Sequence, residues 1–576
     1  MKSIATLLLA AAMCLGAGFL NPGQAAEITA KLHCVLPTIP NGPMLVSFGM
    51  PFPKGFIKDA NLIRVKDAAG TEIPALVRTL VPWRNLAKGT NFSSIRAVLI
   101  QVNVDFGSKR SIILKVETGT TRTKDLAAEQ PVRSNWVLVS DAKYPGKYQV
   151  YEPPVYVSLS PAWLGRCAVK SRVLPYFNDP GFAWYDGPLT NKDPNLNFGQ
   201  NFFKTAINAD PQVTPAERIW YLRKNPYLPP GEDDGSPYEP WLYDRSMTMF
   251  TIYLRSGDYR VLREAHRAAY FYASKLNSNG FFTLKPLEEG GDVKYSYNEC
   301  LFTDLMLLGD EGHLEAIRNV TKAAASFNYV YKGDQGYERL WTERHLAFSW
   351  LAFIVAFEAT GNAGYARQAR LRANYIFHHQ NNPPANADHG QAPDDGALMH
   401  GFDSHEGYWE GGPFWIFSPW QTVLLVDVMQ RYYQHSRDTR VWAAAQRFGE
   451  AVINVADGLR SSTDWPGYEF PELTIPAYLA GSQGNVLEWE DYEHCLDVAK
   501  IPAFAFYCSC LAGAPQEKFR TEAQKLLETA EQVTAYWIRP TAHEAGKSIY
   551  RLSPPRKFGW WFRTTADVDY LLNQSP

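Results

Sequence analysis

The sequence predicts a two-part fold, in which an N-terminal all-β sandwich or barrel precedes an (α/α) toroid of helical hairpins. Residues 27–170 consist of short apolar or alternating runs, and Gly, Pro, Asn and Asp separate these runs at the spacing of β-hairpins. From residue 240 onward the apolar residues recur at helical spacing, and one helix–turn–helix pattern returns along the chain. A sequence of 576 residues is also too long for a single core. We therefore expect a β domain at 27–170 and a toroid domain at 240–576.

Residues 1–26 have the pattern of a secretory signal peptide. Lys2 precedes an apolar run, and the small residues Ala25 and Ala26 close it, so we expect cleavage there and a periplasmic or secreted protein. No later run approaches the ~18 apolar residues of a membrane-spanning helix, so no membrane span is expected. The formal net charge of −2 provides no basic field that would attract nucleic acid.

The expected β domain contains three motifs in a fixed order. They are VSFGMPFPKG at 46–55, the V-x-D-x-x-G-x-x-I-P hairpin at 65–74 with Gly70 in its turn, and SSIRAVLIQV at 93–102. The strand WVLVSD, which begins at Trp136, is assigned to the same domain. The order of the motifs resembles the N-terminal β-barrel of rhamnogalacturonan exolyase-type proteins, although the Trp-x-Asp-Gly that precedes the last strand in that group is absent. The resemblance carries no catalytic residue and implies only a polysaccharide-active context.

Residues 171–239 are rich in Pro, Gly, Asp and Asn and are expected to form an irregular crossover between the two domains. The segment also carries aromatic residues that need packing partners, among them Trp184, Tyr185, Phe198 and Phe202. We therefore expect part of the crossover to pack onto the toroid.

Five helical hairpins are predicted in the toroid domain. Each has an apolar first helix, a small or polar turn, and a second helix rich in Ala and Arg. A turn glycine supplies the left-handed C-cap, and the Asp or Asn that follows can cap the next helix. The first helices are apolar nearly all round and should be buried, whereas the second helices are amphipathic and should lie outside. The hairpins occupy residues 243–276, 301–327, 346–379, 422–455 and 501–533.

This repeat resembles the toroids of polysaccharide lyases, unsaturated-uronyl hydrolases and inverting glycosidases. In such a ring the loops that enter the first helices meet at one mouth, and the Gly-containing turns lie at the opposite end. The entering loops of this chain are rich in aromatic and titratable residues, whereas the turns are not. The asymmetry predicts a functional site at the mouth. The loops are 232–245, 290–300, 333–345, 394–420 and 481–495.

The richest of these stretches is HGFDSHEGYWEGGPFWIFSPWQ at 400–421. Its glycines and prolines predict a shaped loop rather than a regular helix. Tryptophan faces beside acids and imidazoles suit a carbohydrate site, whereas the simpler alternative is a loop whose tryptophans cap the core and whose charges are solvated. Its candidate residues are His400, Asp403, His405, Glu406, Tyr408, Trp409, Glu410, Trp415 and Trp420.

Further candidates for substrate binding come from the other entering loops. Arg344 could bind a carboxylate through two hydrogen bonds, and its neighbour His345 could assist it. Each of these candidates also has a structural alternative: Arg245 could pair with Asp244 at the helix start, Asn298 could serve as an N-cap, and His345 could be hydrogen-bonded within the core. The candidates are Tyr243, Arg245, Tyr297, Asn298, Glu299, Arg344 and His345.

Two chemistries fit these residues. A uronate lyase cleaves by β-elimination and needs a base, an acid and groups that neutralise the substrate carboxylate. Tyr408 and His405 could be the base and acid, and Arg344, Asn298 and His345 the neutralising groups. An inverting glycosidase needs two carboxyl groups ≈ 6.5–9.5 Å apart, which could come from Asp403, Glu406, Glu410 or Glu299. The lyase is the favoured hypothesis, the hydrolase is the alternative, and a non-catalytic periplasmic glycan-binding protein is the third reading.

No cofactor is expected, because the chain contains no P-loop, dinucleotide fingerprint or HExxH-type metal spacing. The sequence leaves a structural Zn²⁺ or Ca²⁺ open as an alternative near His378, His379, Asp388, His389, Asp394 and Asp395. Six of the seven cysteines lie beyond the signal segment, and their wide scatter resembles no disulfide framework. We expect most of them to be buried thiols.

Overall fold

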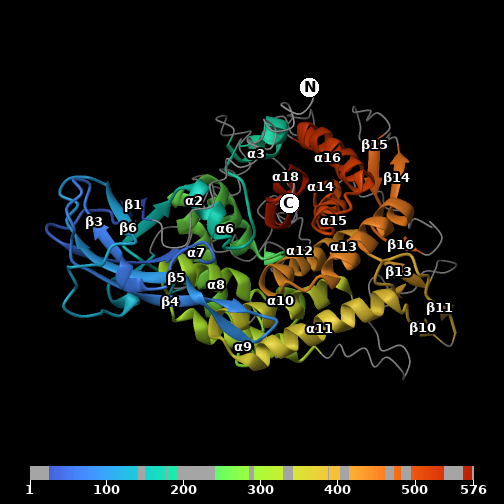
Figure 1. The fold of residues 1–576 in the computed structure, drawn as a ribbon, viewed down its shortest axis with the longest axis horizontal. Helices are drawn as coiled ribbons and strands as arrows, with labels where there is room; N and C mark the ends of the chain where they lie inside the picture. The colour runs from blue at the N-terminus through green and yellow to red at the C-terminus, as the bar shows by residue number, and fades with distance from the viewer. Residues whose placement is uncertain are drawn as a thin grey trace, which may run out of the picture.

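N-terminal antiparallel β-sheets are followed by a mostly helical region in the computed structural model of the chain (Figure 1). The structure describes residues 25–139, 149–176, 178, 180–190, 241–283, 291–327, 342–386, 388–402, 414–460, 473–481, 494–537, 559 and 562–573.

Two antiparallel sheets make up most of the β region. A four-stranded sheet has the order β3-β6-β1-β9, and a three-stranded sheet has the order β2-β5-β4. The predicted hairpin turn between residues 66 and 74 is confirmed, with Gly70 at φ 88°. The strands are β1 (Ala26–Cys34), β2 (Met44–Pro51), β3 (Ile63–Lys66), β4 (Ala75–Asn85), β5 (Thr90–Val104), β6 (Ser111–Thr118), β7 (Val137–Leu138), β8 (Tyr151–Glu152) and β9 (Val155–Leu159).

All five predicted helical hairpins are present. They are α6 (Arg245–Ser256) with α7 (Tyr259–Ser274), α8 (Asn298–Leu308) with α9 (His313–Ala325), α10 (Glu343–Thr360) with α11 (Ala363–Asn381), α12 (Pro419–Ser436) with α13 (Arg440–Ala451), and α15 (Lys500–Leu511) with α16 (Glu517–Trp537).

The predicted capping is confirmed in three of the hairpins. Gly257, Gly309 and Gly361 end α6, α8 and α10 in the left-handed region, at φ 66°, 77° and 73°. Asp258 and Asn362 then cap α7 and α11 by accepting backbone N–H bonds. In the fourth hairpin Arg437 occupies the same position at φ 60° without being a glycine.

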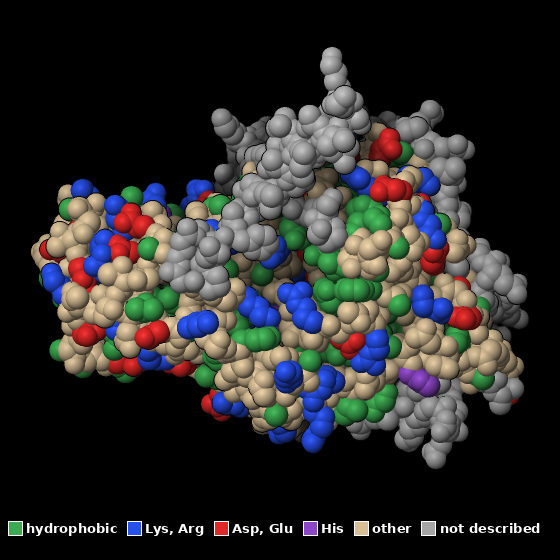
Figure 2. Space-filling model, viewed as in Figure 1, with side chains coloured by type: hydrophobic (Ala, Val, Ile, Leu, Met, Phe, Trp, Pro, Cys, Tyr) green, Lys and Arg blue, Asp and Glu red, His purple; other side chains and the backbone are tan. Residues whose placement is uncertain are grey.

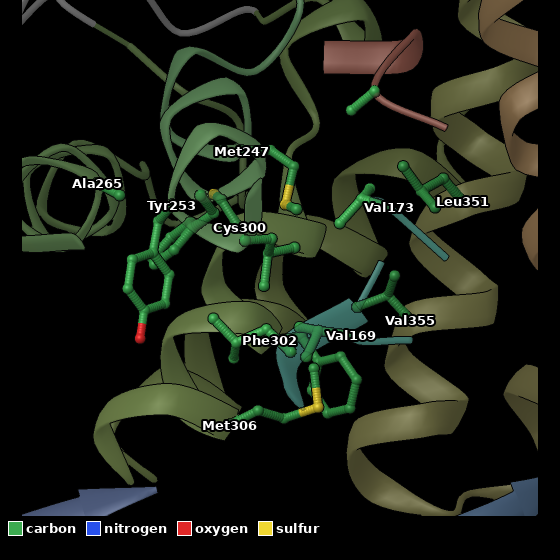
Figure 3. Close-up of a cluster of buried hydrophobic side chains, with 14 of the residues drawn as sticks. Val169, Val173, Met247, Tyr253, Ala265, Cys300, Phe302, Met306, Leu351 and Val355 are labelled. Carbon is green, nitrogen blue, oxygen red and sulfur yellow. The ribbon is translucent and has the colours of Figure 1, made fainter. Parts of the chain in front are cut away.

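The first helices α8, α10 and α12 are buried almost throughout, as their apolar composition predicts. Consecutive first helices contact one another from α6 through α8, α10 and α12 to α15. Figure 3 shows side chains such as Met247 of α6, Phe302 of α8 and Val355 of α10 meeting in this core, together with Val169 and Val173 from the segment after the β region.

The β region packs against the glycine-turn ends of the hairpins. A Cβ atom on Gly309 would lie 2.6 Å from Leu99 Cδ1 of β5, and one on Gly49 of β2 would collide with the Met306 carbonyl. At the end of α10, Arg84 of β4 donates from Nε to the Glu358 carbonyl at 2.7 Å. The covered end of the hairpins is thus the one that the sequence predicts to lie opposite the mouth.

A buried network of ion pairs joins the β region, the first helices and the C-terminal segment. Glu358 of α10 binds Arg96 of β5 and also Arg431 of α12, whose Nε lies 2.8 Å away. Arg431 reaches Glu299 of α8 at 2.6 Å, and Arg563 also binds Glu299, at 2.8 Å. Burial raises the pKa of Glu358, but Arg431 and Arg96 outweigh that effect and hold the pKa well below its usual value.

The network continues through Asp427 of α12. Lys170 and Arg563 lie 3.1 Å and 3.2 Å from this carboxylate, and Lys500 of α15 lies 3.8 Å from it. Lys500 also binds Asp567, just before α18 (Val568–Asn573). The C-terminal segment is therefore held among the first helices by charge pairing as well as by apolar contacts.

Part of the crossover packs onto the helical region, as expected for its aromatic residues. The ring of Tyr185, in α3 (Ala183–Thr190), lies 5.2 Å from that of Phe562, and Asp186 pairs with Arg255 of α6 at 2.6 Å. Phe198 and Phe202 lie outside the described residues.

The remaining helices and strands are α2 (Pro161–Cys167), β10 (Ala385–Asn386), β11 (Gly390–Gln391), β12 (His400–Gly401), β13 (Trp415–Phe417), β14 (Asp457–Arg460), β15 (Leu473–Pro476), β16 (Ala480–Gly481) and α14 (Cys495–Val498).

All six cysteines of the described residues are free thiols, and all but Cys510 are buried, as the sequence predicts. Within the described part of the chain, no helix is both long enough and apolar enough to cross a membrane.

We expect Glu358→Gln to lower the free energy of unfolding by about 3–5 kcal/mol, because it leaves Arg96 and Arg431 buried without their shared counter-charge. The matched control is Glu450→Gln, which breaks the surface pair with Lys518 and should cost about 0–1 kcal/mol. Urea unfolding followed by circular dichroism measures both variants. Equal losses in the two would contradict the assigned role of the network.

Candidate functional site

Side chains from several helix starts gather at the end of the hairpins that faces away from the β region. We call Tyr243, Tyr297, Arg344, Trp420 and His494 the rim cluster. The ring of Trp420 stacks on His494 at 5.0 Å and meets Tyr243 edge-on at 6.1 Å. The backbone N–H of Tyr243 donates to the Tyr297 hydroxyl at 3.1 Å. The cluster therefore brings together residues that are up to about 250 positions apart in the chain. They come from the entering loops, which the sequence predicts to lie close together.

Arg344 is the cation of the rim cluster. Its guanidinium carbon lies 5.4 Å from the centre of the Trp420 ring, and its backbone N–H donates to Gln421 Oε1 at 3.4 Å. Within the described residues it forms no ion pair with a carboxylate. Its guanidinium is hydrogen-bonded to Tyr243, and its buried Nε has no hydrogen-bond acceptor. Burial lowers the pKa of Arg344, but Tyr243 and Asp292 outweigh this effect, so the group stays charged. A charged guanidinium over an indole ring, with donors to spare, can bind an incoming anion.

His345 is held by two neighbours rather than pointing freely into the mouth. Its Nδ1 lies 2.7 Å from the Thr342 hydroxyl and its Nε2 lies 2.9 Å from Asp292 Oδ1. Burial lowers the pKa of His345, although Asp292 partly opposes this. Conversely, burial raises the pKa of Asp292, but His345 and Lys294 hold it well below its usual range. His345 is therefore hydrogen-bonded in place, which is the structural alternative stated for it, and it is the neighbour of Arg344 in the chain.

The backbone before α6 is strained beside the rim cluster. Tyr243 and Asp244 both have positive φ, at 67° and 57°, which is costly for consecutive residues that are not glycine. The Asp244 carboxylate caps α6 by accepting the Met247 N–H at 2.9 Å, yet only 1% of the residue is exposed. Its other oxygen, Oδ2, accepts no hydrogen bond from a nitrogen or oxygen of the described residues. Burial raises the pKa of Asp244 to about 7, despite the opposing charge of Arg563.

Several predicted substrate-binding residues are engaged elsewhere. The Asn298 amide donates to Thr321 Oγ1 at 3.2 Å and to the Ala352 carbonyl at 2.8 Å, and Tyr297 rather than Asn298 holds the N-cap position. Glu299 belongs to the buried ion network, and Arg245 lies over the Trp241 ring at 5.7 Å.

The described parts of the stretch 400–421 are anchored to helix starts. His400 Nε2 lies 3.1 Å from Glu343 Oε2, and Glu343 Oε1 accepts the Ser418 N–H at 2.9 Å. Trp415 donates from its indole N–H to the Gly390 carbonyl at 3.2 Å and packs in a small apolar cluster. Trp420 alone among these three joins the rim cluster. The candidates Asp403, His405, Glu406, Tyr408, Trp409 and Glu410 lie outside the described residues.

Three residues near the rim were not singled out by the sequence analysis. Asp292 lies beside His345, Gln421 accepts from Arg344, and Tyr478 lies 5.5 Å from Trp420. Asp292 stands two residues before Lys294, which is the spacing of an ordinary surface pair, and Tyr478 follows a short apolar run. Neither pattern signals a site.

The residues considered for a structural metal ion do not gather in the described part of the chain. His379 Nε2 lies 2.8 Å from the Met399 carbonyl, and the ring of His389 stacks on Phe414 at 3.8 Å. The one described group with the donors and spacing for a cation is Asp304, Asp310 and His313.

That group does not fit a metal ion well. Arg133 binds both oxygens of Asp310, at 2.8 Å and 2.6 Å, and His266 and His313 both contact Asp304. A bound cation would compete with the guanidinium for the same carboxylate. The cluster is better described as a buried ion-pair chain between the helices and Arg133.

No family model matches this chain, and no curated protein matches it.

We expect Asp244→Asn to stabilise the protein increasingly as pH rises from about 4 to 7. The carboxyl pKa is raised from 3.8 to about 7 on folding, so the folded state binds the extra proton and loses stability as pH rises through that window. Asparagine keeps the N-cap acceptor without the buried charge. Melting temperatures across this pH range measure the effect.

The control is Asp258→Asn, the partly exposed N-cap of α7. If the difference in melting temperature between Asp244→Asn and the native protein does not grow with pH, Asp244 is not protonated in the folded state near neutrality.

Proposed function

We propose that this chain is a secreted or periplasmic enzyme that cleaves a uronate-containing polysaccharide by β-elimination, with Arg344 binding the substrate carboxylate. The observation that carries the proposal is the charged, half-buried Arg344 over Trp420, which is hydrogen-bonded to Tyr243 and forms no ion pair with a carboxylate of the described residues. The almost fully buried Arg431 and Arg563, by contrast, both bind carboxylates. A uronate would supply that charge, and the Trp420 and Tyr243 rings would supply apolar faces for a sugar.

The proposal includes the closure of the five hairpins and the C-terminal segment into an (α/α) toroid. Two observations support it: each first helix contacts the next, and Arg255 of α6 reaches the C-terminal segment through the Ala566 carbonyl at 3.0 Å and Asp569 at 3.5 Å. The β region covers the glycine-turn end, so a substrate would enter from the rim.

In the proposed reaction Arg344 would neutralise the uronate carboxylate and so acidify the C–H bond beside it. A base would remove that proton, the electron pair would form the carbon–carbon double bond, and the glycosidic oxygen would leave with a proton from an acid. We assign the base and the acid to Tyr408 and His405, as the sequence analysis suggests. His345 would contribute through its place beside Arg344 and its hydrogen bond to Asp292.

The hydrolase alternative needs two free carboxyl groups. Glu299 is a weak candidate for this role, because Arg431 and Arg563 occupy its two oxygens at 2.6 Å and 2.8 Å. The alternative therefore depends on Asp403, Glu406 and Glu410. A non-catalytic glycan-binding protein would use the same rings and arginine without a reactive pair.

We expect Arg344→Gln to lower kcat/KM on a uronate polymer by roughly 10²–10³-fold, because it removes the charge that stabilises the developing enolate. Arg344→Lys should recover only part of the activity, since lysine cannot bind a carboxylate bidentately. The ultraviolet absorbance of the unsaturated product measures turnover, and Arg520→Gln on α16 is the control for loss of a surface arginine.

The same assay separates the three readings. Loss of the unsaturated product in both Tyr408→Phe and His405→Ala supports the lyase. Release of reducing ends without that chromophore, abolished by Glu410→Gln, would replace it with the hydrolase. Binding without any product across a panel of polysaccharides would leave the glycan-binding protein.

A further inference from the structure

The outer helix α11 stands in a long stretch of chain without acidic residues. Residues 359–387 contain no Asp or Glu but include Arg367, Arg370 and Arg372. The second half of α9, with Arg318 and Lys322, likewise contains no acid. In a chain with formal net charge −2, these two helices are therefore a local concentration of positive charge.

The two helices flank the same part of α10. Ser349 Oγ donates to the Ala324 carbonyl at the end of α9 at 3.1 Å, and it accepts from Arg372 Nε of α11 at 3.1 Å. Figure 2 shows Lys and Arg side chains gathered over the lower middle of this face, where α9 and the first half of α11 lie in Figure 1, with few acidic side chains between them.

One face of α11 is open along its whole length. Arg367, Asn374, His378 and Asn381 are exposed at helical spacing, and the helix of 19 residues is about 28 Å long. Arg367 forms no ion pair with any residue in the described part of the chain. The other two arginines have structural tasks: Arg370 donates to the Leu86 carbonyl of the β region, and Arg372 holds Ser349.

The open face ends in a groove of about 550 Å³ between α11 and the start of α13. Tyr375 provides a ring at its edge, and Arg440 lies over the Phe377 ring at 4.9 Å. The amide groups of Asn381 and Asn382 donate to the last carbonyls of the helix, at 2.6 Å and 3.0 Å, which fixes both side chains at the groove. Arg440 also pairs with Asp438 at 2.7 Å, so it offers hydrogen bonds rather than net charge.

We infer that the exposed face of α11 and its groove form an accessory binding site for an anionic polysaccharide, separate from the rim cluster. Amides and a tyrosine ring suit the hydroxyl groups and apolar faces of sugars, and the acid-free face with Arg367 favours a chain that carries carboxylates. The few exposed cations are too sparse for the phosphate contacts on which nucleic-acid binding depends. That this polymer is also the substrate of the enzyme rests on the proposed function.

The experiment uses the full mature chain and a double variant, Arg367→Gln with Tyr375→Ala, whose exposed or half-exposed positions should leave the fold intact. Affinity electrophoresis in gels that contain polygalacturonate, alginate or hyaluronate measures binding to acidic polymers, and dextran is the neutral probe. Lys109→Gln, which removes an exposed cation from the β region, is the matched control. Circular dichroism checks that each variant is folded.

We expect the double variant to bind at least one acidic polymer with a Kd roughly threefold to tenfold higher than that of the native chain, and added salt to reduce the difference. Neither dextran binding nor the Lys109→Gln variant should show this change. Turnover of a short uronate oligosaccharide should stay at the native value, while turnover of the polymer at low concentration should fall.

Native binding by the double variant, or absence of binding to all three acidic polymers, would overturn the inference. An equal loss in Lys109→Gln, or equal binding of dextran, would overturn the assignment of charge complementarity to α11. If Arg344→Gln retains the polymer binding that the double variant loses, the two sites are separate. If the native chain makes no product but its polymer binding still depends on α11, the proposed function fails while the accessory site stands.

Discussion

Glu358 lies where three parts of the fold meet, and its charge pairs hold them in place. Arg96 reaches it from the β region, Arg431 reaches it from the neighbouring first helix, and Arg431 continues to Glu299. Arg563 then links Glu299 with Asp427 and brings in the C-terminal segment. Because the desolvation of each of these ions is costly, the arrangement is stable only when all partners are present, so the network favours one relative placement of the segments over others.

This constraint also decides which end of the hairpins the β region covers. Arg84 and Arg96 fix the β strands to the end of α10, and the close approach of Gly49 to Met306 leaves no room for a side chain there. The opposite end collects the helix starts, the strained backbone at Tyr243 and Asp244, and the aromatic rings around Trp420. Arg431 and Arg563 are thus paired with carboxylates inside the bundle, whereas Arg344 at the rim forms no ion pair with a carboxylate of the described residues. The contrast between paired and unpaired arginines is the physical basis of the proposed uronate site.

Burial shifts the pKa of two ionisable groups at this rim, Asp244 and Arg344, and in both it disfavours the charged form. Burial raises the pKa of Asp244 to about 7, so this carboxyl group exchanges its proton near neutrality. Arg344 keeps its charge because Tyr243 and Asp292 lie nearby. The charged guanidinium of Arg344 at this end of the helices can attract an anion.

The amino-acid sequence by itself determined that β structure precedes the helical region, and it determined all five hairpins and the Gly257, Gly309 and Gly361 turns, because periodicity and capping depend on residues close together in the chain. It also placed Tyr243, Arg344 and Trp420 near one another, since each opens a first helix. Only the tertiary structure decided that Glu299 serves the buried network and that Asn298 bonds to Thr321 and Ala352. The partners of Glu299 lie 132 and 264 positions away in the chain. At a helix start, consecutive side chains point in directions that differ by about 100°. A local sequence pattern therefore could not distinguish a residue that faces the rim from one that faces the core.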